Sequence, residues 1–477
     1  MWLKSPGVNS KKSGEFYTPH EVSRVMAEII SHHVETIGKN KISVYDPCSG
    51  SASLLITIGE AAERHGVQPN GVTYYAQELK EATFDLTRMN LLMRDILPND
   101  IVIRRGDTLA EDWPMEDDFD ARAEHNALRV DATVANPPYS QSYSPKDLEH
   151  DPRFAYGLPQ KSKADYAFLE HCLYHLKPDG IMCIVLPHGV LFRGDPNSDS
   201  GEGVIRRELL KRHNIEAVIG LPANIFYGTG IATIIMVLRR QRTDSDVLFV
   251  DASKGFVKDG KKNKLRACDM KRIVDTVVER CEVENYSRVV SYDEIKANGY
   301  NLNIPRYVDS SEPPEKWDIY AFVFGGIPAT EVDEIRELKV LPGLRDDLFR
   351  GDDYLSLTSD DVKGTVYGNA SVQAFQKDYE RSFSGFDMWL HQQLIDKVSQ
   401  VDVKTMEQTI TGEVNGRLAD VSLLDPYDAY QVIDETWATI ANDIEVIHRD
   451  GFNAVRCVDP HMVLSKKKED DGTPVEV

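Results

Sequence analysis

The sequence lacks paired cysteines, long apolar runs and an excess of basic residues. Its 6 cysteines are scattered over 477 residues without a Cys-x-x-Cys pair, which argues against a zinc motif or a disulfide framework and is typical of a reducing compartment. No window approaches about 18 uninterrupted apolar residues, and the first residues contain no apolar signal-peptide core. We therefore expect a cytoplasmic protein that does not enter a membrane and binds no metal ion.

Positive charge is scarce and unevenly placed. The chain has 55 Lys and Arg against 77 Asp and Glu, a net charge of −22 at pH 7. This acidity argues against a protein that binds nucleic acid over its whole surface. Residues 1–310 carry 39 basic and 44 acidic residues (net −5), whereas residues 311–477 carry 16 and 33 (net −17). The asymmetry indicates two regions with different partners.

Alternating strand-like and helical patterns predict an α/β fold with a doubly wound, mostly parallel, Rossmann-like sheet. The strand-like runs lie at residues 42–45, 72–76, 101–103, 132–135, 181–186, 217–219 and 232–238. Helical patterns cover residues 19–37, 81–92 and 166–176, and another begins near residue 54. A segment rich in Pro and Gly at 311–328 marks a boundary. We predict an N-terminal segment with the first helix (1–40), a main domain (41–310) and an acidic, α-rich C-terminal region (311–477).

Three short motifs follow predicted strands, at the sheet edge where doubly wound folds bind ligands. The small residues of Asp46-Pro47-Cys48-Ser49-Gly50-Ser51-Ala52 allow a ligand to approach backbone N–H groups at a helix start, although a plain tight turn would have the same composition. Glu78 is placed to accept a ribose hydroxyl, or to cap the next helix. Asp107 can accept a hydrogen bond from an exocyclic amine, or belong to an ordinary Gly-Asp turn.

The most specific motif is Asn136-Pro137-Pro138-Tyr139, after the fourth predicted strand. The two prolines remove backbone donors and stiffen the loop, and their carbonyls remain acceptors. The carboxamide of Asn136 and the carbonyl of Pro137 can therefore hold an –NH2 group, while the ring of Tyr139 offers a stacking face. An amine held by two acceptors keeps its electron density available for attack on an electrophilic methyl group. The alternative is a stiff loop with Tyr139 packed inward.

This order of motifs resembles the N6-adenine DNA methyltransferases, and in particular the modification (M) subunit of type I restriction–modification systems. Further stretches are similar to that subgroup: Gly14-Glu15-Phe16-Tyr17-Thr18-Pro19, KSKADYAF (161–168), VLPHGVLFRG, AVIGLPANIFYGTGI and GYNLNIPRYVD (299–309). DPYDAYQVIDETW, near residue 425, also matches it. The resemblance covers residues 13–309 densely and the C-terminal region thinly.

The resemblance implies S-adenosyl-L-methionine as cofactor and a methyltransferase role for residues 41–310. Glu78 would then bind the ribose and Asp107 the adenine amine. Asn136, Pro137, Pro138 and Tyr139 would hold a target adenine flipped out of double-stranded DNA, with Phe226 and Tyr227 as candidates for the opposite stacking face or, alternatively, core aromatics. The methionine half of the cofactor would contact Glu15, Phe16, Tyr17, Thr18, Pro19, His20, Asp46, Pro47, Ser49, Gly50, Ser51 and Ala52.

The same resemblance implies partners. No basic recognition module follows the catalytic motifs, so we expect a separate specificity subunit, a second copy of this chain and a restriction/translocase subunit in an antiviral defence complex. The family's N-terminal helical domain has no counterpart in the residues before Gly14, which implies a truncated chain or a role taken by another subunit. The basic run at 258–266 can contact phosphate or form a solvated loop.

Two other functions stay open. The Asn136 motif also suits methylation of a glutamine amide in a protein, although the subgroup stretches argue against it. A non-catalytic assembly subunit that keeps the fold and binds partners through residues 311–477 is the alternative from a different class.

Overall fold

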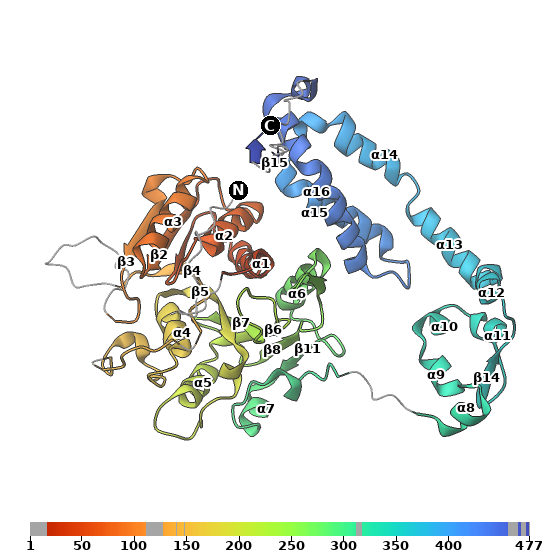
Figure 1. Cartoon of the computed structure of the whole chain (residues 1–477), viewed down its shortest axis with the longest axis horizontal. Coiled ribbons are helices and arrows are strands. Elements are labelled where there is room, and N and C mark those ends of the chain that lie inside the picture. Colours follow the sequence, from red (N-terminus) through yellow and green to blue (C-terminus); the bar gives the residue numbers. More distant parts are fainter. Residues whose placement is uncertain are drawn as a thin grey trace. The chain divides into compact units, whose positions relative to one another are not determined.

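A computed structural model describes residues 17–110, 127–139, 141–146, 148–311, 317–456, 466–468 and 474–476. The predictions for Glu15 and Phe16 lie outside these residues. The chain divides into two compact units, residues 1–314 and 315–477, whose elements are labelled in Figure 1.

The first unit is built on a nine-stranded sheet with the order β11-β8-β6-β7-β5-β4-β1-β2-β3. Neighbouring strands are parallel except where β7 pairs with β5 and β6, and where β11 pairs with β8. The strands are β1 (Ile42–Asp46), β2 (Val72–Glu78), β3 (Ile101–Arg105), β4 (Val130–Ala135), β5 (Leu176–Pro187), β6 (Ile215–Gly220), β7 (Thr233–Arg239), β8 (Val247–Asp251) and β11 (Ser287–Val290). A separate antiparallel hairpin joins β9 (Val257–Asp259) to β10 (Lys262–Lys264).

Helices pack on both faces of this sheet (Figure 1). They are α1 (His20–Thr36), α2 (Ser53–Arg64), α3 (Glu81–Leu92), α4 (Asp165–Tyr174), α5 (Glu202–Lys211), α6 (Ala267–Glu279) and α7 (Tyr292–Ala297). Helix α1 buries Val22, Val25, Met26, Ile29 and Ile30, the helical spacing of one apolar face. It packs against α2 and α6.

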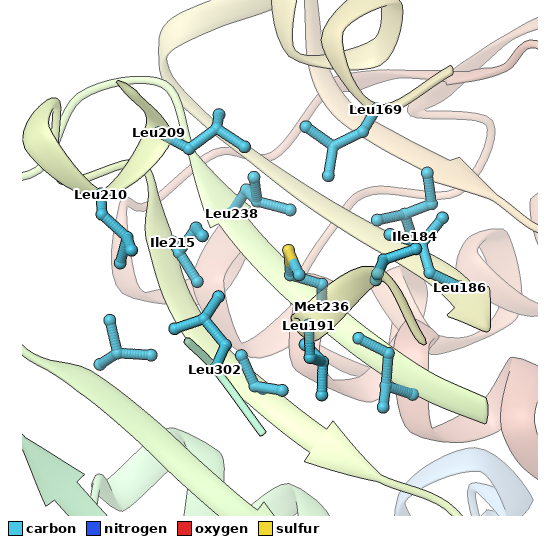
Figure 2. Packing of buried hydrophobic residues seen from close by; sticks show 14 of the residues in the cluster. Leu169, Ile184, Leu186, Leu191, Leu209, Leu210, Ile215, Met236, Leu238 and Leu302 are labelled. Carbon is cyan, nitrogen blue, oxygen red and sulfur yellow. The ribbon is translucent and has the colours of Figure 1, made fainter. Parts of the chain in front are cut away.

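Strand β5 is a continuous apolar run in the sequence, and the packing around it, beneath α4 and α5, explains why. Met182, Ile184 and Leu186 belong to one buried cluster, while the alternate residues Cys183 and Val185 are buried outside it. Both faces of a strand covered by helices must be apolar. Figure 2 shows side chains of β5 and β7 meeting Leu169 of α4 and Leu209 of α5.

The described part of the second unit is mostly helical. Its helices are α8 (Ile319–Phe324), α9 (Ala329–Glu334), α10 (Arg336–Val340), α11 (Leu344–Leu348), α12 (Val362–Gly368), α13 (Ala370–Ser382), α14 (Phe386–His391), α15 (Val403–Leu418) and α16 (Pro426–Asp450). Short antiparallel pairs join β14 (Tyr354–Leu357) to β12 (Ile327–Pro328) and β13 (Phe349–Arg350), and β15 (Lys466–Lys468) to β16 (Pro474–Glu476). Val414 of α15 and Trp437 and Ile444 of α16 form its main buried cluster.

The predicted α/β class and central sheet are confirmed. The predicted helix at 81–92 has these bounds in the structure, and α1 differs from the predicted 19–37 by one residue at each end. The strands β8 and β11, which extend the sheet beyond β6, were not predicted. Within the described ranges, no helix combines the length and apolar character that crossing a bilayer requires.

Candidate functional site

The predicted motifs lie along one edge of the sheet. The parallel strands β4, β1, β2 and β3 are neighbours in that order, and each ends at this edge. Asp46 is the last residue of β1 and Glu78 the last of β2, while Asp107 and Asn136 follow β3 and β4. The sheet topology therefore brings together residues that span 90 positions of sequence, from 46 to 136.

The turn from β1 to α2 is held by the backbone of β2 and by side chains of α3. Ser49 donates its backbone N–H to the Gln77 carbonyl (3.0 Å). Thr87 donates to the Gly50 carbonyl (2.7 Å), and Asn90 donates to the Ser51 carbonyl (2.9 Å). The sequence did not indicate these contacts. Polar residues inside a strand or a helix, such as Gln77, Thr87 and Asn90, belong to no recognisable motif.

The side chain of Glu78 also forms hydrogen bonds that hold this turn. One carboxylate oxygen accepts the Gly50 N–H (3.1 Å), and the other accepts the Lys80 N–H (3.1 Å). Gly50 and Ala52 both have positive φ, 56° and 62°. Glycine adopts this conformation without strain, whereas an alanine does so at a free-energy cost of about 1 kcal/mol.

Asp46 is the most buried acid of the edge, at 1% exposure. Burial raises the pKa of its carboxyl to about 7, the nearby charge of Glu78 also raises it, and the hydrogen bond from the Cys48 N–H (3.0 Å) opposes the rise. Asp46 forms no ion pair with a described residue. The turn therefore places a carboxyl that titrates near neutral pH beside Glu78, where a bound cationic group would favour the ionised form of Asp46.

The loop after β4 is joined to the segment before α1. The Asn136 carboxamide nitrogen donates to Oγ1 of the buried Thr18 (2.9 Å), and the Tyr139 hydroxyl donates to Oδ1 of Asn136 (2.9 Å). Pro137 is buried, and Pro138 is half-buried. Thr18 and Pro19 are buried, whereas Tyr17 and His20 are exposed.

The two aromatic candidates of the 226–227 pair differ sharply in exposure. Phe226 is buried at 1% exposure, with its ring edge-on to Tyr139 at a centroid distance of 6.1 Å. Tyr227 is 59% exposed. Burial raises the pKa of Tyr17, and its neighbours Tyr227 and Glu21 raise that pKa further. Tyr227 and Tyr17 are thus the exposed rings beside the Asn136 loop.

Asp107 is exposed and caps its own turn by accepting the Leu109 N–H (3.0 Å). The next residues are held by Arg153, a buried side chain that the sequence did not single out. It donates to the Thr108 carbonyl (2.7 Å) and is paired with Asp151 (2.7 Å). Thr108 in turn donates to the Pro47 carbonyl (2.7 Å), so this network connects two of the motifs.

Within the described ranges, Glu28, His32 and His65 form a group whose possible ligand atoms lie within 4.8 Å of one another. These groups already have partners. Glu28 is paired with Arg64 (2.5 Å) and His65 (2.9 Å), and His65 contacts Glu35 through its other ring nitrogen (2.7 Å). That the chain binds no metal ion stays a prediction, since the same side chains could exchange these partners for a metal ion.

Comparison with known proteins identifies relatives of the first unit. The sequence profile of a family described as N-6 DNA methylase matches residues 4–316. The methylase subunit of the type I restriction enzyme MpnII from Mycoplasma pneumoniae is 35% identical over 326 residues, which are 67% of this chain and 57% of that relative. The MjaVIII methylase subunit from Methanocaldococcus jannaschii is 30% identical over 65% of this chain and 52% of its own length.

A solved structure agrees. The methyltransferase subunit of the type I restriction–modification system from Streptococcus thermophilus is 40% identical, with a TM-score of 0.56, over 63% of this chain and 61% of that subunit. This chain therefore matches between about half and two thirds of the length of these proteins.

Proposed function

Because the chain belongs to the N-6 DNA methylase family, we propose that it transfers a methyl group from S-adenosyl-L-methionine to N6 of adenine in DNA. We infer that it does so as the modification subunit of a type I restriction–modification complex. The observation that carries the proposal is the Asn136–Tyr139 loop at the end of β4, beside the β1–α2 turn with its two carboxylates.

The residues at the sheet edge fit the cofactor. S-adenosylmethionine supplies an electrophilic methyl group on a sulfonium and carries a positively charged amino group. The carboxylates of Asp46 and Glu78 favour such a cation, and Gly50 and Ala52 turn the backbone at the start of α2. We assign the ribose to Glu78, the adenine amine to Asp107, and the methionine half to Glu15–His20 and the β1–α2 turn.

The chain's own residues would then orient the target amine. Oδ1 of Asn136 and the carbonyl of Pro137 accept hydrogen bonds from N6 of a flipped adenine, and Tyr139 stacks on the base. These contacts hold the nitrogen in line for attack and exclude water, so no strong base is required before transfer. The exposed ring of Tyr227 is better placed than buried Phe226 to contact the opposite face of the base.

Partners follow from the same assignment. Residues 1–310 are nearly neutral, whereas residues 311–477 carry a net charge of −17, which disfavours contact with DNA. We infer that a specificity subunit selects the sequence, that the second unit binds protein, and that a second copy and a restriction/translocase subunit complete the assembly.

Single-molecule sequencing of DNA from cells that carry the chain tests this function. We expect N6-methyladenine at a defined site, and its loss with Asn136→Ala while the purified variant still binds S-adenosylmethionine in calorimetry. Asn99→Ala, an exposed asparagine in the turn before β3, is the matched control and should retain the methylation.

Methylation that survives Asn136→Ala would contradict the catalytic assignment. Absence of S-adenosylmethionine binding by the wild-type chain would favour a non-catalytic assembly subunit. Transfer of labelled methyl groups to a glutamine peptide but not to DNA would indicate the protein-methylating alternative.

A further inference from the structure

The β9–β10 hairpin concentrates positive charge on a chain that is otherwise acidic. Residues 254–264 contain five lysines and one acid, Asp259. Lys258 and Lys261 are exposed near the hairpin's tip and form no ion pair with a described residue. Exposed lysines without an acidic partner are available to bind phosphate groups.

Other basic residues of the same stretch are engaged within the protein. Arg266 pairs with Asp269 (2.9 Å) and Lys271 with Asp275 (3.0 Å). The Arg272 guanidinium lies 4.3 Å from the centroid of the Tyr286 ring. Arg266, Lys271 and Arg272 are therefore engaged within the protein, whereas Lys258 and Lys261 of the hairpin have no such partner among the described residues.

The hairpin is fastened to the loop that carries Phe226 and Tyr227. Asn263 donates its backbone N–H to the Asn224 carbonyl (3.2 Å) and its side chain to the Ala223 carbonyl (2.7 Å). The Lys262 ammonium donates to the carbonyls of Phe226 and Thr229, and lies 5.8 Å from the Tyr227 ring centroid. Lys262 thus fixes the loop, while Lys258 and Lys261 face solvent.

The loop that holds the hairpin also contacts the Asn136 loop. Phe226 contacts Tyr139, whose hydroxyl donates to Asn136. On the other side, Lys264 lies 3.7 Å from Glu21, in the first turn of α1 and three residues after Thr18. The exposed lysines therefore lie on an element bonded directly to the residues around the candidate target-base site.

We propose that Lys258 and Lys261 of the β9–β10 hairpin bind the DNA phosphates that flank the flipped adenine. The proposal rests on the proposed function, because it takes DNA as the substrate of the adjacent site. The two lysines give this chain a local contact with the strand to be modified, while sequence selection remains with the specificity subunit. Phosphate contacts of this kind fix register and orientation without reading bases.

Charge removal at the tip tests the proposal. The full chain is titrated with a fluorescein-labelled, 30-base-pair duplex of random sequence, and anisotropy is followed from low to moderate salt. For Lys258→Gln/Lys261→Gln we expect weaker binding and a slope of log K against log salt that is lower by about 2, since each lost phosphate contact removes about 0.9. The variant should still bind S-adenosylmethionine with unchanged affinity.

Lys41→Gln/Lys296→Gln is the matched control. Both lysines are exposed, and both lie toward the opposite edge of the sheet, since Lys41 precedes β1 and α7 follows the antiparallel strand β11. This double variant has the same net charge as the test variant, and we expect it to keep the wild-type salt slope. The comparison of the two double variants distinguishes a local phosphate contact of the hairpin from a general effect of net charge.

Mass spectrometry of lysine acetylation with and without the duplex gives a second readout. We expect Lys258 and Lys261 to be protected and Lys41 and Lys296 to react as before. Equal slopes for the two double variants, unprotected hairpin lysines, or no binding of the duplex at low salt would each overturn the proposal. Failure of the proposed function has a different signature: loss of S-adenosylmethionine binding or of methyl transfer, neither of which enters the DNA titration.

Discussion

The carboxamide nitrogen of Asn136 donates a 2.9 Å hydrogen bond to Oγ1 of Thr18, 118 residues earlier in the chain. This bond fixes the orientation of the amide, because only the nitrogen can donate to the threonine oxygen while Oδ1 accepts from Tyr139. Thr18 was assigned to the cofactor from the sequence. The structure gives it a contact with the residue that we propose to hold the target amine.

Thr18→Val should therefore lower the rate of methyl transfer. Valine keeps the shape of threonine but cannot accept the bond, so the Asn136 amide loses its orientation. Loss of one such hydrogen bond, about 1–1.5 kcal/mol, corresponds to a fall in kcat of about tenfold. Thr18→Ser retains the hydroxyl and should retain most of the activity. Single-turnover transfer to DNA and calorimetry with S-adenosylmethionine measure the two effects separately; a weaker cofactor Kd with unchanged kcat would assign Thr18 to the cofactor alone.

Asp46 should make cofactor binding depend on pH. Burial raises the pKa of this carboxyl to about 7, so the carboxylate that favours a cation is mostly present at pH 8 and mostly protonated at pH 6. We expect the Kd for S-adenosylmethionine to rise about tenfold between these pH values, in proportion to the loss of the ionised form. Calorimetry over this range measures it.

The control is Asp46→Asn, which removes the titrating group and should bind weakly with little dependence on pH. A wild-type Kd that is constant from pH 6 to 8, or an equally steep dependence in Asp46→Asn, would show that another group titrates.

From the sequence we could predict which residues lie at the ligand-binding edge of the sheet, but not the hydrogen bonds between them. Asp46, Glu78, Asp107 and Asn136 could be placed because each follows an apolar strand, and parallel strands end at a common edge. The bond from Asn136 to Thr18 could not be foreseen, since it depends on how the segment before α1 returns to β4.

The limits of prediction for the fold have a similar cause. Strands β8 and β11 are short, and the antiparallel pairing of β11 with β8 is decided by tertiary contacts. The exposure of Tyr227 beside buried Phe226 is also a tertiary property, because adjacent aromatics in a loop have no periodicity that distinguishes them.

Ala52→Gly should stabilise the first unit. Ala52 has a φ of 62°, and removing its Cβ relieves the left-handed strain, partly offset by the greater freedom of glycine in the unfolded chain. We expect a net gain of about 0.5 kcal/mol, or about 1 °C in Tm. Ala61→Gly, in the buried interior of α2, is the control and should lower stability by about 1–2 kcal/mol. A lower Tm for Ala52→Gly would show that its methyl contacts outweigh the strain.

The ion pairs of Glu28 should stabilise the packing of α1 on α2 over a defined pH window. Burial opposes ionisation of Glu28, but the hydrogen bond from His65 and the charge of Arg64 outweigh it and hold the pKa of Glu28 at about 2, below the usual 4.5. Its contribution is present above pH 4.5 and is lost as the pH falls toward 2. Burial also opposes protonation of His65, yet its bonds to Glu28 and Glu35 raise its pKa above 6.5, so its contribution is present below pH 6.5 and is lost as the pH rises through that raised value.

Both contributions coincide between pH 4.5 and 6.5. We expect Glu28→Gln to lower the free energy of unfolding by about 2 kcal/mol at pH 5.5, and by less at pH 8.5, because the contribution of His65 declines as the pH rises through its raised pKa. Denaturant unfolding at both pH values measures the difference. Glu60→Gln is the control: its pair with Arg94 is exposed, so its removal should change stability by less than about 0.5 kcal/mol at either pH. An effect of Glu28→Gln that is equal at pH 5.5 and 8.5 would mean that Arg64 alone carries the interaction, because of the two partners of Glu28 only His65 loses charge as the pH rises.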